Sequence, residues 1–165
     1  MLSEVRPGIA ANVPGSLRPA READLDLFDG WCNAFCRDCN LPLHPPDQQL
    51  LRSRQHIERG EPHFWEVDGR PVSTASAWGK TPNGIRISLV YSPPHLRGRG
   101  YASACVAALS QRMLDSGRKF CFLFTDLANP TSNKIYAAIG YEKVCEDEQI
   151  FFDPPARGEK IEDGR

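Results

Sequence analysis

The pattern of apolar and polar positions changes several times along the chain between the helical period of about 3.6 residues and the strand period of two. Helical spacing predicts helices at Arg21–Cys39, from Pro45 or Pro46 to Gly60, at about Gly98–Ser116, and from Asn129-Pro130 to Gly140. Alternation or short apolar runs predict strands at Ser16–Arg18, Phe64–Val67, Pro71–Trp78, Ile85–Tyr91, Phe120–Phe124, Glu142–Cys145 and Gln149–Phe152. Because helices and strands alternate, the sequence predicts the α/β class.

Within Ile85–Tyr91 the alternation predicts one side of a strand formed by Ile85, Ile87, Leu89 and Tyr91. The two ends of the chain lack such periodicity. Residues 1–15 combine prolines and glycines and predict a flexible N-terminal tail, and residues 154–165 predict a flexible C-terminal tail. A single domain at 16–153 is expected between them.

Length and composition narrow the classes of function. The chain has 165 residues, enough for one domain with a sizeable core. Its formal net charge is -1 and it has no basic stripe, which argues against a nucleic-acid partner. No apolar run approaches the ~20 residues of a membrane span, and the N-terminus lacks the layout of a secretion signal. We therefore expect no membrane partner, a cytoplasmic location and free thiols rather than disulfides.

Three of the six cysteines lie on one predicted helix: Cys32, Cys36 and Cys39, with His44 beyond them. Zinc accepts three thiolates and an imidazole, but one straight helix cannot surround a tetrahedral ion. Cys32 also belongs to the apolar stripe of that helix. Buried thiols are the favoured interpretation and no metal is expected, with a zinc site as the alternative.

The predicted strand Ile85–Tyr91 is followed by a proline-rich turn, then by a glycine-rich segment that leads to Ala102, and then by a helix. The first N–H groups of a helix lack partners within it, and the helix dipole adds positive charge there, so such a terminus can bind phosphate. Gly98 and Gly100 let the backbone approach an anion, and Arg97 and Arg99 add charge. The alternative is a loop that merely starts a helix, and the glycine spacing fits neither a Walker loop nor a dinucleotide fingerprint.

Two motifs in this order resemble the GNAT superfamily of N-acetyltransferases. Its signature is Arg/Gln-x-x-Gly-x-Gly/Ala after a strand, met here by Arg97, Gly100 and Ala102. A second family element is an asparagine after the next strand, a tyrosine seven residues later, then glycine and an aromatic residue, here Asn129, Tyr136, Gly140 and Tyr141. This chain also resembles one bacterial branch of the superfamily in the run LFTDLANPTSNKIY at 123–136. Members of that branch often carry an extra N-terminal domain, which we do not expect here.

The resemblance implies a GNAT-like fold, with a mixed, mostly antiparallel central sheet flanked by about four helices. Its fourth and fifth strands would run parallel and splay apart. The pantetheine arm of acetyl-CoA would lie in that gap, against Leu89, Val90, Tyr91 and Ser92. The pyrophosphate would be held by backbone N–H groups of Arg97, Gly98, Arg99, Gly100, Tyr101 and Ala102. Asn129 would contact the pantetheine amides, and the Tyr136 hydroxyl would protonate the departing thiolate.

The general base is left open by the sequence. An alkylamine has a pKa near ~10.4 and must lose a proton before it attacks a thioester. Many GNAT relatives carry a carboxylate on the fourth strand for this step, whereas this strand offers Arg86 and Ser88. Glu66, Asp126 and a water chain are the alternatives.

The resulting hypothesis is an N-acetyltransferase with an acyltransferase domain at 16–153. It would transfer an acetyl group from acetyl-CoA, used as a co-substrate, to a primary amine by direct attack in a ternary complex. The alternative is a non-catalytic acyl-CoA-binding or sensor module. A cationic acceptor would suit the acidic residues Asp24, Asp26 and Asp29, but a solvated helix face explains them equally well. A homodimer is left open.

Overall fold

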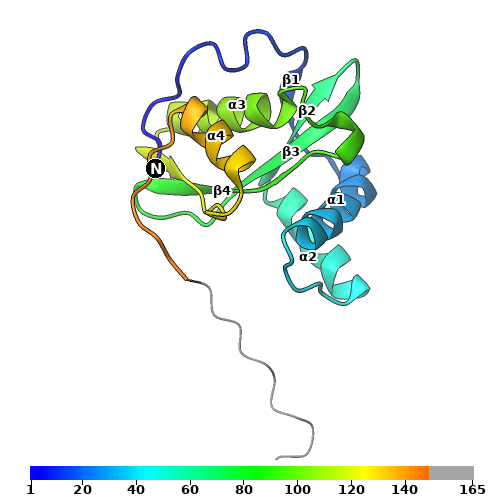
Figure 1. The fold of residues 1–165 in the computed structure, drawn as a ribbon. Helices are drawn as coiled ribbons and strands as arrows, with labels where there is room; N and C mark the ends of the chain where they lie inside the picture. The colour runs from blue at the N-terminus through cyan, green and yellow to red at the C-terminus, as the bar shows by residue number, and fades with distance from the viewer. Residues whose placement is uncertain (149–165) are drawn as a thin grey trace, which may run out of the picture.

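The computed structural model describes residues 1–148 as a five-stranded sheet with helices on both faces (Figure 1). Neighbouring strands pair antiparallel except β4 and β5, which run parallel. This confirms the mixed, mostly antiparallel α/β sheet predicted from the sequence. In spatial order the strands are β1 (Ser16–Pro19), β2 (Pro62–Val67), β3 (Arg70–Trp78), β4 (Gly84–Tyr91) and β5 (Phe120–Phe122).

Each face of the sheet is covered by a pair of helices, and each pair encloses an apolar core. On one face α1 (Leu25–Asp38) contacts β4 and α2 (Pro46–Glu58). On the other face α3 (Tyr101–Asp115) contacts β2, β3 and β4, with α4 (Pro130–Ile139) beside it (Figure 1). Short 3-10 turns at Glu22–Asp24 and Pro94–Leu96 precede α1 and the loop before α3. The larger core lies under α3, and the smaller one lies between α1 and the sheet.

The ends of α4 are formed by the residues that the sequence indicated. The side chain of Asn129 accepts a hydrogen bond from the Ser132 N–H at 3.1 Å, so it caps a first turn that would otherwise lack an acceptor. Pro130 occupies the first helical position, where its missing N–H costs nothing. Gly140 ends the helix in the left-handed region, at a φ of +116°.

The strand β4 is interrupted by a bulge. Thr74 of β3 pairs with Tyr91, and Ser76 pairs with Ser88, so two residues of β4 face a single residue of β3. One of the two is Leu89, whose φ of +50° lies in the left-handed region that side chains other than glycine rarely adopt. Between these two pairs β4 therefore has one residue more than β3, which forces a local change of direction.

The bulge corrects the predicted alternation of β4. Ile85 and Ile87 do share the face that packs beneath α3. Leu89, however, packs on the opposite face against the cluster under α1, and the Tyr91 ring lies 5.9 Å from the ring of Trp31 of α1. One inserted residue shifts the period-two pattern by one position, so the later side chains change face.

Pairing between β4 and β5 is short. It is limited to Gly84 with Phe120, Ile85 with Cys121 and Arg86 with Phe122. Beyond Arg86 no further residue of β4 pairs with β5 within residues 1–148. The two parallel strands consequently part in the middle of β4, as the resemblance to the GNAT fold implied.

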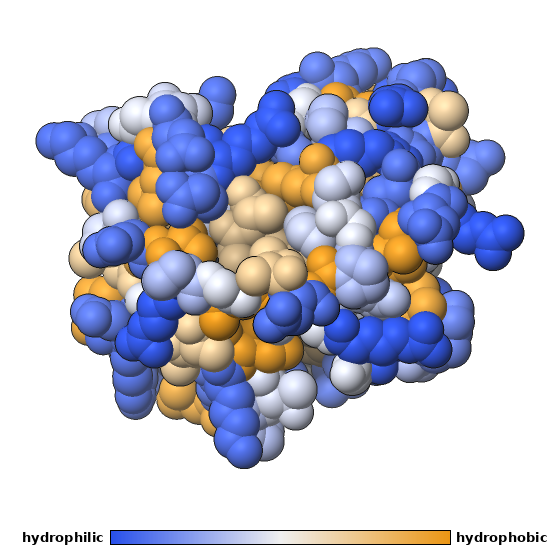
Figure 2. Space-filling view, turned by 90° about the horizontal axis from the view of Figure 1, so that it is seen from above, coloured by the Kyte–Doolittle hydropathy of each residue, from blue (hydrophilic) through white to orange (hydrophobic). Residues whose placement is uncertain are grey.

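Residues 1–15 differ from the flexible tail expected from their prolines and glycines. Leu2 is only 1% exposed, and its backbone exchanges two hydrogen bonds of 2.8 Å with Cys121 of β5. The Arg6 N–H donates to Ile139 at 2.9 Å, and the carbonyl of Pro14 accepts from Trp65 Nε1, also at 2.9 Å. In Figure 1 this segment runs above α3. Figure 2 shows the molecule from above, with apolar side chains surrounded by hydrophilic ones at the rim. Its apolar side chains join the main core, which periodicity cannot reveal in an irregular segment.

The strand predicted at Glu142–Cys145 is not formed. Leu2 occupies the outer edge of β5 at Cys121, and the N–H of Glu142 donates to Met1 at 2.9 Å instead of to the sheet. The edge that this segment would need is therefore already paired. The strand predicted at Gln149–Phe152, the domain end at 153 and the tail at 154–165 lie outside the described residues.

The packing of the N-terminal segment leads to the first prediction. Leu2→Ala should lower the free energy of unfolding by about 2–5 kcal/mol, because it removes a buried side chain from the core. Leu51→Ala, at a position of α2 that is 56% exposed, is the control and should change stability by less than about 0.5 kcal/mol. Chemical denaturation of both variants measures the difference. Equal stability of the two variants would show that residues 1–15 do not pack as described.

Candidate active site

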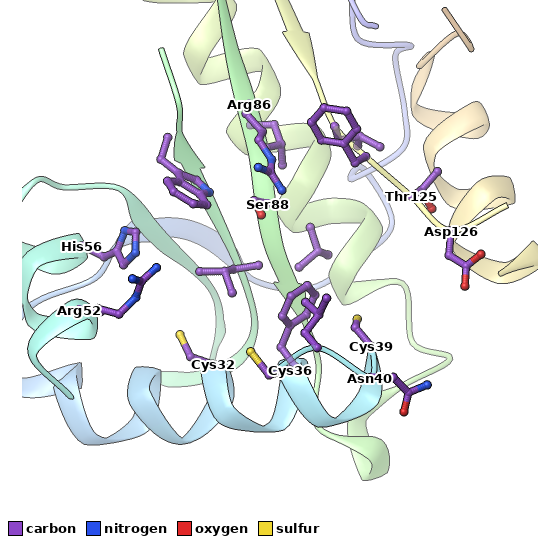
Figure 3. Close-up of a pocket in the computed structure, with 18 of the residues that line it drawn as sticks. Cys32, Cys36, Cys39, Asn40, Arg52, His56, Arg86, Ser88, Thr125 and Asp126 are labelled. Atoms are coloured by element: carbon purple, nitrogen blue, oxygen red, sulfur yellow. The ribbon is translucent and has the colours of Figure 1, made fainter. Parts of the chain in front are cut away.

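A cavity of about 570 Å³ opens where β4 and β5 part (Figure 3). It lies between the bulged half of β4, the segment after β5, and the helices α1 and α2. Sheet residues form its floor, and thiol, basic and aromatic side chains form its walls. The residues that line it include Cys32, Cys36, Cys39, Arg52, His56, Trp78, Arg86, Ser88, Leu89, Val90, Phe124, Asp126, Tyr136 and Asp147.

The floor of the cavity is set by the register of β3 and β4. Trp78 pairs with Arg86, and Ser76 pairs with Ser88, so Arg86 and Ser88 lie on the same face of β4. The guanidinium carbon of Arg86 lies 5.3 Å from the ring centre of Trp78 and 5.0 Å from that of Phe124. A cation held between two aromatic rings has a fixed plane and a fixed position. The sequence indicated Arg86 only as one of two residues on the strand where many GNAT relatives carry a carboxylate.

Three thiols of α1 face this floor. Figure 3 shows Cys32 and Cys36 pointing from α1 toward the sheet, with Cys39 further along the same helix. Burial raises the pKa of Cys32 to about 12 and also raises the pKa of Cys36 and of Cys39, so all three remain thiols at neutral pH. Among residues 1–148 no three His, Cys, Asp or Glu side chains are grouped closely enough to hold a metal ion.

Tyr136 reaches the cavity from α4. Its ring stacks edge-to-face with that of Tyr141 at 6.0 Å, which fixes its direction. The hydroxyl makes no hydrogen bond to any of the described residues, so it is available to a ligand. Burial raises the pKa of Tyr136 to about 12, and the phenol therefore keeps its proton at neutral pH. A protonated hydroxyl at a cavity wall is a potential proton donor.

The structure brings one of the two candidate carboxylates to the cavity. Asp126 lines it, although its Oδ1 already accepts the N–H of Ala128 at 2.8 Å. Glu66 does not reach the cavity: its carboxylate is bound by Arg18, which also pairs with Asp24 at 2.7 Å. The partner of Glu66 comes from β1, a contact between distant segments that the sequence did not reveal. Glu66 is therefore not retained as a candidate base.

A histidine that sequence reasoning missed also lines the cavity. His56 of α2 stacks edge-to-face on Trp78 at 5.3 Å, and its Nδ1 contacts the carboxylate of Glu61. A carboxylate at Nδ1 orients the ring and leaves Nε2 for other partners. No sequence motif marks this pair, because its function depends on where α2 meets β3.

The loop before α3 lies beyond the cavity, at the end of β4. Gly98 and Gly100 have φ values of +75° and +80°, and an added Cβ at Gly98 would meet no atom within 4 Å. No side chain caps α3. The backbone N–H groups from Gly98 to Ser103 donate no hydrogen bond to residues 1–148. The loop thus offers a continuous set of free donors next to open space.

The arginines of this loop differ in role. Arg97 donates from Nε to the carbonyl of Ser92 at 2.9 Å, pairs with Asp38 of α1, and lies over the ring of Tyr91. These contacts hold the loop against β4 and α1, so Arg97 acts as a brace rather than as a free charge. Arg99 is exposed and makes no ion pair among the described residues.

The other residues that the GNAT resemblance assigned to acyl-CoA lie in different places. Leu89 and Val90 line the cavity at the bulge. Tyr91 and Ser92 are buried where β4 leads into the loop, and the Ser92 hydroxyl donates to that of Ser73 at 2.9 Å. Asn129 does not line the cavity, since its side-chain oxygen caps α4.

The sequence matches the model of the acetyltransferase (GNAT) family over residues 28–141, and the chain belongs to this family. No curated protein matches the sequence. No helix of residues 1–148 is long and apolar enough to cross a membrane.

Solved structures share the fold at low sequence identity. The aminoglycoside acetyltransferase AAC(6')-Iy, in complex with a bisubstrate analogue, is 19% identical with a TM-score of 0.66, over 86% of this chain and 98% of that one. A Clostridium acetobutylicum protein described as a predicted acetyltransferase, crystallised with acetyl-CoA, is 13% identical with a TM-score of 0.64, over 82% and 95%. A transcriptional regulator from Bacillus halodurans is 19% identical with a TM-score of 0.65, over 84% and 99%. Such identities establish the fold alone.

Proposed function

We propose that the protein is an acyl-CoA-dependent N-acyltransferase that transfers an acetyl group from acetyl-CoA to a primary amine. The observation that carries the proposal is the alignment of three features along β4. Free backbone donors lie at its end, a bulge opens a cavity at its middle, and the Tyr136 hydroxyl faces that cavity. Membership of the GNAT family and structural neighbours bound to CoA derivatives support the same function.

The loop from Gly98 to Ser103 is the proposed site of the CoA pyrophosphate. Its N–H groups have no acceptor among residues 1–148, and they lie at the positive end of the α3 dipole. The open space at Gly98 allows phosphate oxygens to come close to the backbone. The residues present therefore fit the group, with the exposed Arg99 as an additional cation.

The pantetheine arm is proposed to lie along β4 where β5 has separated from it. The backbone of β4 beyond Arg86 lacks a partner strand on that side among the described residues, so its polar groups can bind the amides of the arm. The arm would bring the thioester to the bulge at Leu89 and Val90, within the cavity. A backbone N–H of the bulge would then stabilise the oxyanion that forms during transfer.

The proposed reaction is a direct attack in a ternary complex. The amine nitrogen forms a bond to the thioester carbonyl carbon, and collapse of the tetrahedral intermediate breaks the carbon–sulfur bond. The thiolate receives a proton from Tyr136, which is then replenished from water. The proton released by the amine passes, directly or through water, to one of the two groups at the cavity that can accept it, His56 or Asp126. His56 has the stronger case because Asp126 already accepts a backbone N–H.

The alternative is a module that binds acyl-CoA without turning it over. One structural neighbour is described as a transcriptional regulator, which is consistent with this alternative. A sensor needs the loop but no proton donor in the cavity. Tyr136, with a free hydroxyl and a raised pKa, favours the enzyme.

The proposal is tested by incubating the protein with acetyl-CoA and a library of primary amines. Release of CoA thiol with at least one amine, together with stabilisation by acetyl-CoA alone, is the expected result. Tight binding of acetyl-CoA without any transfer would support the sensor. Absence of binding at millimolar acetyl-CoA would reject both readings.

A second prediction concerns the loop. Gly98→Val should weaken CoA binding at least about tenfold, because its side chain would fill the space next to the free N–H groups. Gly60→Val is the matched control: Gly60 also has a positive φ, of +67°, and no atom within 4 Å of an added Cβ. Both variants should lose a similar stability of about 1–2 kcal/mol. Equal CoA affinity of the two variants in calorimetry would contradict the assigned site.

A third prediction concerns proton donation. Tyr136→Phe should keep the affinity for acetyl-CoA and lower kcat by about 100-fold, the low end of general acid catalysis, since a thiolate is already a fair leaving group. Tyr141→Phe is the control: it removes a buried hydroxyl bonded to Ser110 at 2.8 Å and should affect stability rather than kcat. If Tyr136→Phe turns over at the wild-type rate with chemistry limiting, Tyr136 is only a packing residue.

A further inference from the structure

The cavity contains a cation, Arg86, without an ion-paired or hydrogen-bonded partner among residues 1–148. None of the nitrogen atoms of Arg86 makes a hydrogen bond or an ion pair within 4.0 Å in the part of the chain that the structure describes. Arg18 is instead saturated by Asp24 and Glu66, and Arg97 is occupied by Asp38. An arginine stays charged at any ordinary pH, so a half-buried one without a partner is costly unless a ligand completes it.

The position of Arg86 directs its free donors into the cavity. The rings of Trp78 and Phe124 cover the guanidinium and leave the Nε buried without an acceptor. The outer nitrogens, Nη1 and Nη2, are not buried and make no hydrogen bond to the described residues. They are therefore open to the cavity. Two parallel N–H groups held in a fixed plane match the two oxygens of a carboxylate.

The surroundings favour an anionic ligand at this end. Arg52 of α2 lines the same wall and also lacks an ion pair among residues 1–148. The buried Nε1 of Trp78, paired across the strands with Arg86, is a further donor without an acceptor there. Burial lowers the pKa of Arg86, and the charge of Asp147, which also lines the cavity, partly offsets that effect. Asp147 makes no ion pair with Arg86 within 4.0 Å.

The acidic residues that suited a cationic acceptor are not at this site. Asp24 pairs with Arg18, and Asp29 accepts a hydrogen bond from the Ser53 hydroxyl at 2.8 Å. Neither these two nor Asp26 lines the cavity. Two arginines, Arg52 and Arg86, line the cavity together with Asp126 and Asp147, so the cavity lacks the excess of carboxylates that a polycationic acceptor needs.

We infer that the acceptor is an amine that also carries a carboxylate, which Arg86 binds while the amine lies at the bulge. This inference rests on the proposed function. Arg86 precedes Leu89 by three residues, a distance of about 10 Å along the strand, which the length of the arginine side chain shortens. The amine and the carboxylate must consequently belong to one small molecule or one chain end, as in amino acids.

The inference is tested with matched amines that differ by the carboxylate alone: L-lysine against cadaverine, and L-phenylalanine against phenethylamine. The wild-type protein with acetyl-CoA should prefer the carboxylated member about tenfold or more in kcat/KM. Arg86→Gln should abolish that preference while leaving the affinity for acetyl-CoA unchanged. Arg86→Lys, which keeps the charge without the planar fork, should recover only part of it. Arg54→Gln, which neutralises an arginine that does not line the cavity, is the control.

A binding measurement separates this inference from the proposed function. N-acetyl-L-phenylalanine should bind the wild-type protein more tightly than N-acetylphenethylamine, and Arg86→Gln should remove the difference, whether or not turnover is observed. Equal binding and equal turnover within each pair would overturn the inference, and so would a preference that survives in Arg86→Gln. Failure of acetyl-CoA to bind would instead reject the proposed function. The comparison of N-acetyl-L-phenylalanine with N-acetylphenethylamine would then still decide whether Arg86 binds a carboxylate.

Discussion

The early end of the pairing between β4 and β5 is the constraint on which the site depends. Three residue pairs join the strands, and then β4 bulges at Leu89 while β5 turns away. A left-handed leucine costs about 1–2 kcal/mol. Packing of that side chain in the cluster under α1 offsets this cost, so the helix that walls the cavity also stabilises the strand distortion that opens it. The cavity, its thiol-bearing wall and the reach of Tyr136 all follow from this separation.

Unsatisfied donors mark both ends of β4. At one end, the N–H groups from Gly98 to Ser103 have no acceptor among residues 1–148, and at the other end Arg86 makes no hydrogen bond or ion pair with these residues. Elsewhere in the described fold Arg18 and Arg97 each make an ion pair with a carboxylate. A buried donor without a partner is rare in a folded protein and needs an explanation, of which a bound ligand is one. Two anionic groups, one from each substrate, would flank the thioester at the bulge between them.

Local signals in the sequence predicted local structure well. The cap at Asn129, the left-handed Gly140 and the glycine loop before α3 depend on neighbours only a few residues away, and each is found as expected. The α/β class followed from the order of helices and strands, and the mixed, mostly antiparallel sheet followed from the resemblance to the GNAT fold. The loop and Tyr136 were also found from sequence, because their spacing resembles a known family.

Contacts between distant segments could not be predicted in this way. The bulge at Leu89 has no glycine or proline to indicate it, and it reverses the faces of the residues that follow. The engagement of Glu66 by Arg18 and the stacking of His56 on Trp78 depend on how strands and helices meet. The stacking of Arg86 between Trp78 and Phe124 joins three separate segments, so a single sequence gives no sign of it.

The central claim is that acyl-CoA binds along β4 from the loop to the bulge, and amide NMR during a titration with acetyl-CoA tests it most directly. The account predicts that the backbone N–H resonances of Gly98–Ser103 shift most, as they acquire phosphate acceptors, followed by those of Leu89–Tyr91 at the bulge. A second pocket is lined by Leu127, Asn133 and residues 141–147. Shifts centred on that pocket, or an absence of shifts in the loop at saturation, would contradict the account.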